Sequence, residues 1–201
     1  MSLLVPFMAA EEIRRAAESV LEQHQPGGGI PIEIEQIIEF GFEMEIRPVK
    51  GLNARFGLEG AISHGLDTVV VDEDFMTRTQ NRYRFTLAHE LGHRVLHGDI
   101  IRNIQFGDRQ GWKSAVLSID AQAYARLEHQ AYVFAGHMLV PTSALMDACE
   151  EARRLAVGVD LSEMGTTAIS YVAGNIAKEF RVSTAVMERR IAAERMFEAG
   201  S

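Results

Sequence analysis

The chain has 201 residues, of which 47% are hydrophobic and 24% charged, and its formal net charge is -8 at pH 7. This composition is typical of a globular protein that buries a core, and the negative charge argues against non-specific nucleic-acid binding by the whole chain, although it allows a local basic face. The single cysteine, Cys149, excludes an intramolecular disulfide framework and is typical of a reducing compartment.

The first eight residues are mildly apolar, lack a basic leader and run directly into charged residues. No uninterrupted apolar stretch approaches the length that spans a membrane. We therefore expect a cytoplasmic protein without a membrane partner.

Hydrophobic periodicity predicts two helices near the N-terminus. The first covers about residues 9–25 and ends at Pro26 and the three glycines that follow, and the second covers residues 31–40 and ends at Gly41. The glycine run lacks the Lys-Ser/Thr pair and the preceding strand of a phosphate loop, so we interpret it as a linker. Residues 42–49 then alternate as a strand.

A small sheet is predicted before the next helix. Residues 54–62 and 68–72 form an antiparallel pair around a turn at residues 63–67, and the helix follows from about Asn81 to His97. An exposed sheet edge beside a cleft can bind an extended peptide by strand addition. The sequence does not decide which strand forms this edge, or whether the strands only support the helix.

The helix over residues 81–97 carries the motif His89-Glu90-x-x-His93. Residues four apart lie nearly above each other on a helix, so the two histidines direct their imidazoles to one point. Glu90 lies about 100° further round and can take a proton from a water at that point. Protein ligands that leave one position open, with a carboxylate beside it, are the arrangement of a zinc hydrolase.

The opposite face of this helix is apolar, so we expect it to lie in the core while the histidines face a cleft. Gly92 adds little bulk and allows another segment to approach closely. The alternative is a solvated helix with incidental histidines. It is disfavoured because buried histidines and a buried glutamate are costly without a partner. The apolar residues are Leu87, Ala88, Leu91 and Val95.

Residues 98–120 are predicted to form a long loop, which can include a short strand at residues 115–119. A long segment near an active site is a candidate flap that contacts the substrate, with Trp112 as its apolar contact. Burial of Trp112 in a small satellite core is an equally good interpretation.

A zinc site needs a third ligand, and the helical segment at residues 128–139 offers one. Its apolar residues follow the spacing of a buried face, which extends back to Glu128. A carboxylate on a core-facing stripe is costly unless a cation compensates it, so Glu128 is the predicted ligand. Asp120 is the competing acid, and a salt bridge to an arginine is the alternative role for Glu128. The three-histidine pattern HExxHxxGxxH is disfavoured because Leu96 and Asp99 occupy its last two positions.

Four further side chains are candidates to support the ligands or to stabilise the oxyanion of a tetrahedral intermediate. His97 extends the histidine row of its helix, whereas His137 falls on the far face of its own helix from Glu128. The sequence does not choose the oxyanion donor among them. The candidates are His97, Tyr132, His137 and Tyr171.

The C-terminal part is predicted to be helical, with a first helix over residues 143–157. From Thr166 the apolar spacing resembles a helix-turn-helix, in which Ser183 caps the second helix. We therefore divide the chain into residues 1–157, with the N-terminal helices and the metal motif, and residues 158–201, an all-α module.

This module carries basic residues that could face a phosphate backbone: Arg189, Arg190 and Arg195. Glu188 and Glu194 interleave with them, so DNA binding is a weaker interpretation than a packing or substrate-recognition role.

The combination of motifs resembles the ImmA/IrrE family of zinc metallo-endopeptidases over about residues 30–195. The resemblance implies an α+β fold, with a zincin-like core that contains a small antiparallel or mixed sheet and is followed by a helix-turn-helix-like module. It also implies a Zn²⁺ ion held by His89, His93 and Glu128, with Glu90 as catalytic base. The matching stretches are residues 84–93, then Glu128, Ala131, Phe134 and Ala135, and then Leu139-Val140-Pro141.

The resemblance further implies a partner, because family members cleave a transcriptional repressor in stress responses or mobile-element control. The chain departs mildly from the family pattern, which often has Asn in place of Tyr132 and Met-Pro in place of Val140-Pro141. Neither change affects the proposed metal donors.

Two functions follow from these patterns. The first is a zinc endopeptidase that acts on a repressor. The second is a non-catalytic, zinc-stabilised module that binds a repressor or DNA. The intact motif favours the first, because a structural zinc site would close with a fourth ligand and would not require Glu90.

Overall fold

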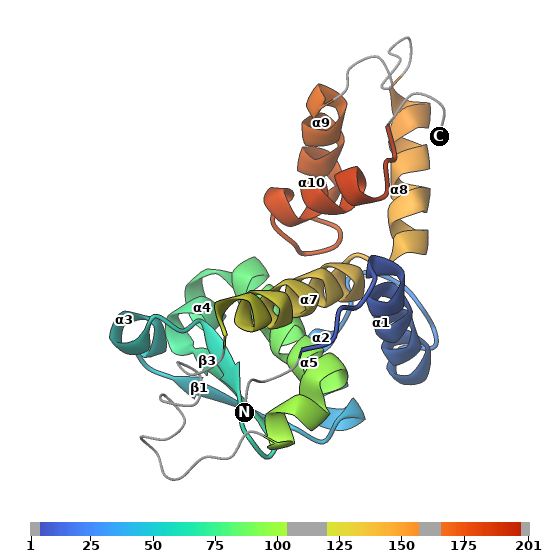
Figure 1. The fold of residues 1–201 in the computed structure, drawn as a ribbon. Helices are drawn as coiled ribbons and strands as arrows, with labels where there is room; N and C mark the ends of the chain where they lie inside the picture. Colours follow the sequence, from blue (N-terminus) through green and yellow to red (C-terminus); the bar gives the residue numbers. More distant parts are fainter. Residues whose placement is uncertain (1–4, 104–119, 157–165, 198–201) are drawn as a thin grey trace.

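The computed structural model describes residues 5–103, 120–156 and 166–197 (Figure 1). The protein is a mostly helical α+β structure, which confirms the predicted class. Two long helices, α5 (Gln80–Asn103) and α7 (Ala121–Leu139), pack against each other at its centre. The sheet lies to one side of them, and a group of C-terminal helices lies to the other.

The N-terminal helices agree with the sequence pattern in part. Helix α1 (Ala10–His24) forms as predicted and packs on α7. The second helix begins later than predicted, with α2 (Ile34–Gln36), and continues as the π-helical turn η1 (Ile37–Gly41). The later start has a tertiary cause, because the carbonyl of Ile32 accepts a hydrogen bond of 2.6 Å from the buried guanidinium of Arg84.

The sheet is mixed and has the order β1-β3-β2. Strand β1 (Glu45–Val49) runs parallel to β3 (Thr68–Asp72), and β2 (Gly60–Ile62) runs antiparallel to it. The predicted antiparallel pair is therefore confirmed at its core. In the described sheet β1 and β2 are the two edges, and β2 is the one that packs beside α5.

The first half of the strand predicted over residues 54–62 is wrong, because helix α3 (Leu52–Phe56) occupies this region. Gly51 and Gly57 flank the helix with φ of 68° and 70°, in the left-handed region that favours glycine. The carboxylate of Asp72 also binds the backbone amide of Asn53 at 2.7 Å. The glycine turns at both ends and the hydrogen bond from Asn53 to Asp72 therefore favour a helix over the predicted strand.

The loop predicted from residue 98 is wrong at its start, because α5 continues to Asn103. Gly98 is buried, and Ile100 packs against a small cluster that includes Val5 and Leu127, so tertiary contacts support the extra turns. Residues 104–119, with Trp112 and the predicted short strand, lie outside the described residues. The short helix α4 (Glu73–Arg78) precedes α5.

The apolar face of α5 lies in the core as predicted, with Leu87, Ala88 and Leu91 fully buried. Gly92 allows α7 to approach, because a Cβ atom there would lie 3.1 Å from the Phe134 ring and 3.2 Å from the backbone of Ala131. This close packing brings the histidine row of α5 opposite α7.

The C-terminal helices are α8 (Thr142–Leu155), α9 (Thr166–Ile176) and α10 (Thr184–Ala193). The Ser183 hydroxyl caps α10 as predicted and accepts a hydrogen bond of 3.3 Å from the amide of Val186. The domain boundary between residues 157 and 158 lies outside the described residues and stays a prediction.

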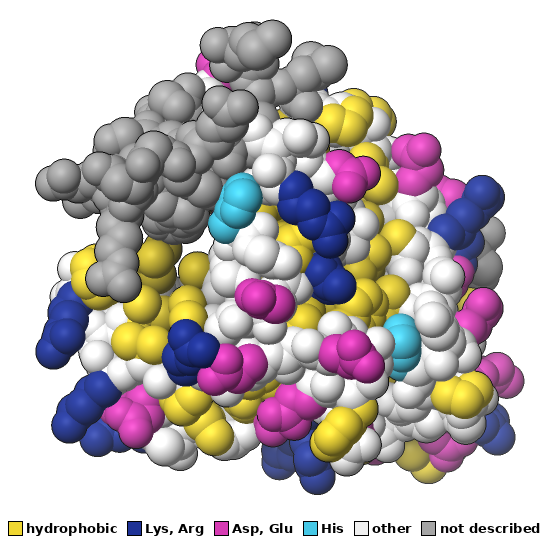
Figure 2. Space-filling view, turned by 90° about the horizontal axis from the view of Figure 1, so that it is seen from below, with side chains coloured by type: hydrophobic (Ala, Val, Ile, Leu, Met, Phe, Trp, Pro, Cys, Tyr) yellow, Lys and Arg dark blue, Asp and Glu magenta, His cyan; other side chains and the backbone are white. Residues whose placement is uncertain are grey.

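Two surface properties bear on partners. Among the described helices, none is long and apolar enough to cross a membrane. Acidic and basic side chains are interspersed on the face shown in Figure 2. The described residues of that face therefore offer no continuous basic surface to a nucleic acid.

Candidate metal centre

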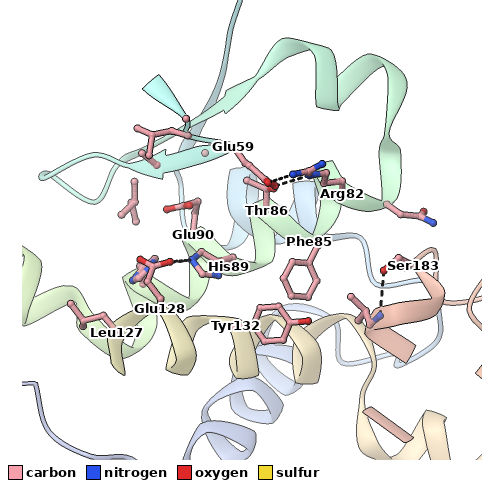
Figure 3. Close-up of a pocket in the computed structure, with 18 of the residues that line it drawn as sticks. Glu59, Arg82, Phe85, Thr86, His89, Glu90, Leu127, Glu128, Tyr132 and Ser183 are labelled. Atoms are coloured by element: carbon pink, nitrogen blue, oxygen red, sulfur yellow. Dashed lines mark hydrogen bonds and ion pairs between the residues drawn. The ribbon is translucent and has the colours of Figure 1, made fainter. Parts of the chain in front are cut away.

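Helices α5 and α7 bring three donor groups together. The Nε2 atoms of His89 and His93 lie 3.1 Å apart. The carboxylate of Glu128 reaches them from α7, with oxygen-to-nitrogen distances of 3.3 Å to His89 and 3.5 Å to His93 (Figure 3). These ligand atoms all lie within 4.8 Å of one another.

The spacing of the donors fits a tetrahedral ion. Metal-to-ligand bonds of about 2.0–2.2 Å at tetrahedral angles separate donor atoms by about 3.3 Å. Two neutral imidazoles and one carboxylate are the donor set of open zinc sites, and they leave the fourth position for a water or a substrate. The residues present therefore fit a divalent ion of this kind.

Contacts among the donor groups shift the pKa values of Glu128 and His89. Burial opposes ionisation of Glu128, but hydrogen bonds from His89 and His93 outweigh it and hold the pKa of Glu128 well below its usual range. Burial likewise opposes protonation of His89, but the hydrogen bond to Glu128 and the nearby carboxylates raise its pKa. The cluster thus contains a carboxylate that stays ionised and attracts positive charge.

The sequence placed Glu128 on the core side of α7, and this detail is wrong. Its side chain is 39% exposed and faces a cleft. Among the described residues its ionic partners are histidines, and the predicted alternative of an arginine salt bridge is not found. Asp120, the competing acid, caps α7 by accepting hydrogen bonds from the amides of Gln122 and Ala123.

A chain of hydrogen bonds behind His93 sets its tautomer. The amide nitrogen of Gln130 donates to the carbonyl of Pro6, so its oxygen faces Nε2 of His97 at 2.8 Å. Nε2 of His97 therefore donates, and its Nδ1 accepts from Nδ1 of His93 at 3.1 Å. In the neutral ring this leaves the lone pair of His93 on Nε2, where a metal would bind, whereas the hydrogen bond from Nε2 to Glu128 belongs to the protonated ring.

Glu90 lies beside the donors but points to the sheet side of the cleft (Figure 3). It is 6% exposed, and burial raises its pKa, although His93 and His89 oppose the shift. A carboxylate with a raised pKa is suited to take and return a proton near neutral pH.

The donors open into a cavity of about 750 Å³ between α5, α7, the β2 segment and the start of α10. The row Tyr124, Glu128, Tyr132 on α7 lies opposite the row Phe85, His89, His93 on α5. Figure 3 shows Phe85 and Tyr132 on the side of the cleft towards Ser183, and their ring centroids lie 5.0 Å apart.

The sheet closes the opposite wall. Gly60 of β2 lies so close to α5 that a Cβ atom there would be 2.5 Å from the Thr86 methyl group and 3.5 Å from Glu90. Glu59, which precedes β2, forms an ion pair with Arg82 of α5 (Figure 3). Glycine therefore lets the edge strand lie directly above the motif.

The other predicted site residues divide into two groups. Tyr132 lines the cleft, and His97 lies behind His93. His137 is buried away from the cleft, near Arg190, and Tyr171 is 61% exposed on α9. The structure therefore does not bring His137 or Tyr171 to the metal centre.

Several cleft residues were missed from the sequence. Phe85 and Tyr124 could have been found, because each lies four residues before a proposed ligand on its helix. No sequence signal placed Glu59 or Arg189 in the cleft, because their positions depend on contacts between distant segments.

Comparisons with known proteins place these features in a family. No curated protein matches this chain. A solved structure described as a Mycobacterium tuberculosis transcriptional regulator has a similar fold, with a TM-score of 0.52 and 16% identity over 90% of this chain. The chain spans about half of that protein, 52% of its length. The profile of the IrrE N-terminal-like domain, Peptidase_M78, matches residues 71–192, more than half of the chain. The match includes His89, Glu90, His93 and Glu128, and the chain therefore belongs to the IrrE N-terminal-like family of metallopeptidases.

Proposed function

We propose that the protein is a zinc-dependent endopeptidase whose metal is held by His89, His93 and Glu128. The observation that carries this proposal is the position of Glu90, a buried carboxylate with a raised pKa directly beside a three-donor set that opens into a cleft. A purely structural metal site needs neither the open position nor the acid.

A bound zinc ion would supply a Lewis acid that polarises the scissile carbonyl and lowers the pKa of a water. Glu90 would take the proton from the attacking water and return it to the leaving amine. Tyr132 is the favoured oxyanion donor among the four candidates, because it is the one whose hydroxyl-bearing side chain lines the cleft.

The substrate would bind as an extended segment. Strand β2 is an edge of the described sheet and lines the cleft above Glu90, so a peptide can pair with it by strand addition. An extended segment is found in loops and locally unfolded regions, and these are the parts of a protein that the cleft would accept.

A transcriptional repressor is the proposed protein substrate, on the basis of the family resemblance. Such a substrate is cytoplasmic, in agreement with the expected location of the enzyme. DNA binding by the C-terminal helices is a weaker proposal, because Arg190 is 5% exposed and hydrogen-bonded to protein, while Arg189 lines the cleft.

The test compares wild type with Glu90→Gln, both loaded with zinc. We expect both to hold about one zinc ion per chain and wild type alone to cleave peptides in a mixture of known sequences, as followed by mass spectrometry. Equal cleavage by Glu90→Gln would contradict the role of Glu90. A wild-type protein that binds zinc and a partner without cleaving anything would instead be the non-catalytic module.

A further inference from the structure

The start of α10 forms the end of the cleft that lies beyond Tyr132. Three of its residues line the cavity together with the capping serine: Ser183, Ala185, Val186 and Arg189. The C-terminal helices thus contribute to the cleft directly and do more than pack against the core.

Arg189 is held in place by Tyr132. Its guanidinium carbon lies 5.1 Å from the centre of the Tyr132 ring, and one of its nitrogens donates to the Tyr132 hydroxyl. Tyr132 follows Glu128 by one helical turn on the same face of α7. The guanidinium is therefore fixed on the wall that also carries the third metal donor.

Arg189 is the basic residue of the cleft that has no ion-pair partner among the described residues. Arg82 is paired with Glu59 across the sheet wall. The carboxylates of Glu90 and Glu128 would balance a divalent ion. Among the described residues no carboxylate forms an ion pair with Arg189, so the cleft with its metal carries one uncompensated positive charge at the α10 end.

The remaining donors of Arg189 suit one kind of ligand. A guanidinium presents five N–H groups in a planar fork, and the Tyr132 hydroxyl occupies one nitrogen. A fork with free donors matches the two oxygens of a carboxylate. The other lining groups at this end are mostly apolar, including Phe85 and Val186, so a carboxylate there would find Arg189 as its cationic partner.

We propose that Arg189 selects substrates that carry an Asp or Glu side chain close to the scissile bond, and this inference rests on the proposed peptidase function. One helical turn along α7 from Glu128 to Tyr132 covers roughly 6 Å, and an extended peptide advances about 3.3 Å per residue. The acidic side chain therefore lies within about three residues of the bond that is cleaved, always on the same side.

The test profiles cleavage of a peptide mixture of known sequences by zinc-loaded wild type, Arg189→Gln and Arg189→Glu. We expect wild type to enrich Asp and Glu about fivefold at one fixed position, as for a partly exposed ion pair. Arg189→Gln should lose the enrichment, and Arg189→Glu should prefer Lys or Arg there. Arg154→Glu, with the same charge change on α8 and outside the cleft lining, should keep the wild-type profile.

A binding arm separates this inference from the proposed function. Zinc-loaded Glu90→Gln, with and without Arg189→Glu, is applied to an array of short peptides in which one position varies among Asp, Asn and Lys. Preference for Asp that reverses with Arg189→Glu supports the inference even if wild type cleaves nothing. Two results would contradict the inference and leave the peptidase function intact. One is cleavage by wild type without enrichment of Asp or Glu at a fixed position, and the other is a preference for Asp that remains after Arg189→Glu.

Discussion

The Nδ1 atoms of His93 and His97 lie 3.1 Å apart, and the proton between them belongs to His93. The assignment follows from Gln130, whose amide oxygen requires a donor from the other nitrogen of His97. Burial lowers the pKa of His97 to about 4, although Gln130 opposes the shift, so the ring stays neutral near pH 7 and can accept from His93. His97 thus orients His93, the proposed metal ligand that precedes it by one turn.

The replacement His97→Phe should weaken zinc binding about 10- to 100-fold, because His93 would lose the acceptor that fixes its ring and tautomer. Competition with a chromophoric chelator measures the affinity. His129→Phe is the matched control, since His129 is an exposed histidine of the same helix as Glu128. Equal affinity of the two variants would show that the contact between His93 and His97 has no effect on the metal.

The third donor can be tested through stability. Zinc that binds only the folded protein should raise its melting temperature, by an amount that grows with the zinc concentration. Glu128→Ala should abolish most of this increase, because the remaining two histidines bind the ion weakly. Differential scanning fluorimetry with and without a chelator gives the result. A full zinc-dependent increase in Glu128→Ala would remove Glu128 from the ligand set.

Replacement of two glycines by alanine should have opposite effects on stability, because Gly92 lies at the tight contact between α5 and α7 and Gly174 lies in open space on α9. Gly92→Ala should cost about 1–3 kcal/mol in unfolding free energy, because the new methyl group meets Phe134 and the backbone of Ala131. It should also weaken zinc binding by pushing Glu128 away from the histidines. Gly174→Ala in α9 meets no atom within 4 Å and should stabilise the protein by about 0.5–1 kcal/mol. Urea unfolding of both variants provides the comparison.

Adjacent arginines of α10 should differ in their effects on stability. Arg190 donates to the Val140 carbonyl, the Thr142 hydroxyl and Glu194, and its side chain is 6% exposed. Arg190→Ala should therefore cost about 2–3 kcal/mol of unfolding free energy. Arg189→Ala should change it by less than about 0.5 kcal/mol, as usual for an exposed side chain. Similar losses in the two variants would contradict the division between a structural and a substrate-reading arginine.

His137 should make the metal-free protein sensitive to mild acid. Burial and the nearby Arg190 lower its pKa from 6.5 to about 4, and Glu194, Arg14 and Glu11 are the other charged groups near it. Because the folded pKa lies below the unfolded one, the unfolded chain takes the proton first as the pH falls. Stability is therefore lost between pH 6.5 and about 4, by at most about 1.4 kcal/mol per pH unit.

His137→Gln should reduce this pH dependence, and His129→Gln, at an exposed position of the same helix, is the matched control. Urea unfolding at several pH values, with chelator in every sample, measures the difference. An unchanged slope in His137→Gln would assign the acid sensitivity to other groups.

The predictable part of the structure is the part that local spacing determines. The four-residue spacing within α5 predicted that His89 and His93 lie together, and apolar periodicity identified α1 and α10, whereas Glu128 was selected for a core-facing position that it does not have. These patterns depend on the geometry of one helix, which each segment carries in its own residues.

The parts that escaped prediction depend on contacts between distant segments. Helix α3 replaces a predicted strand because Asp72 binds an amide 19 residues away, and the last turns of α5 form because Ile100 meets another helix. The α10 wall of the cleft likewise depends on Arg189 reaching Tyr132, which lies 57 residues earlier. The spacing of residues within one segment does not predict such contacts between distant segments.

Strand β2 comprises only Gly60, Ala61 and Ile62. Three residues offer a visiting peptide a very short ladder of backbone hydrogen bonds, and backbone pairing is the part of recognition that every sequence can share. Peptides without matching side chains would consequently dissociate before they react. Under the proposed function, the brevity of this strand would therefore limit the cleavage of unrelated proteins.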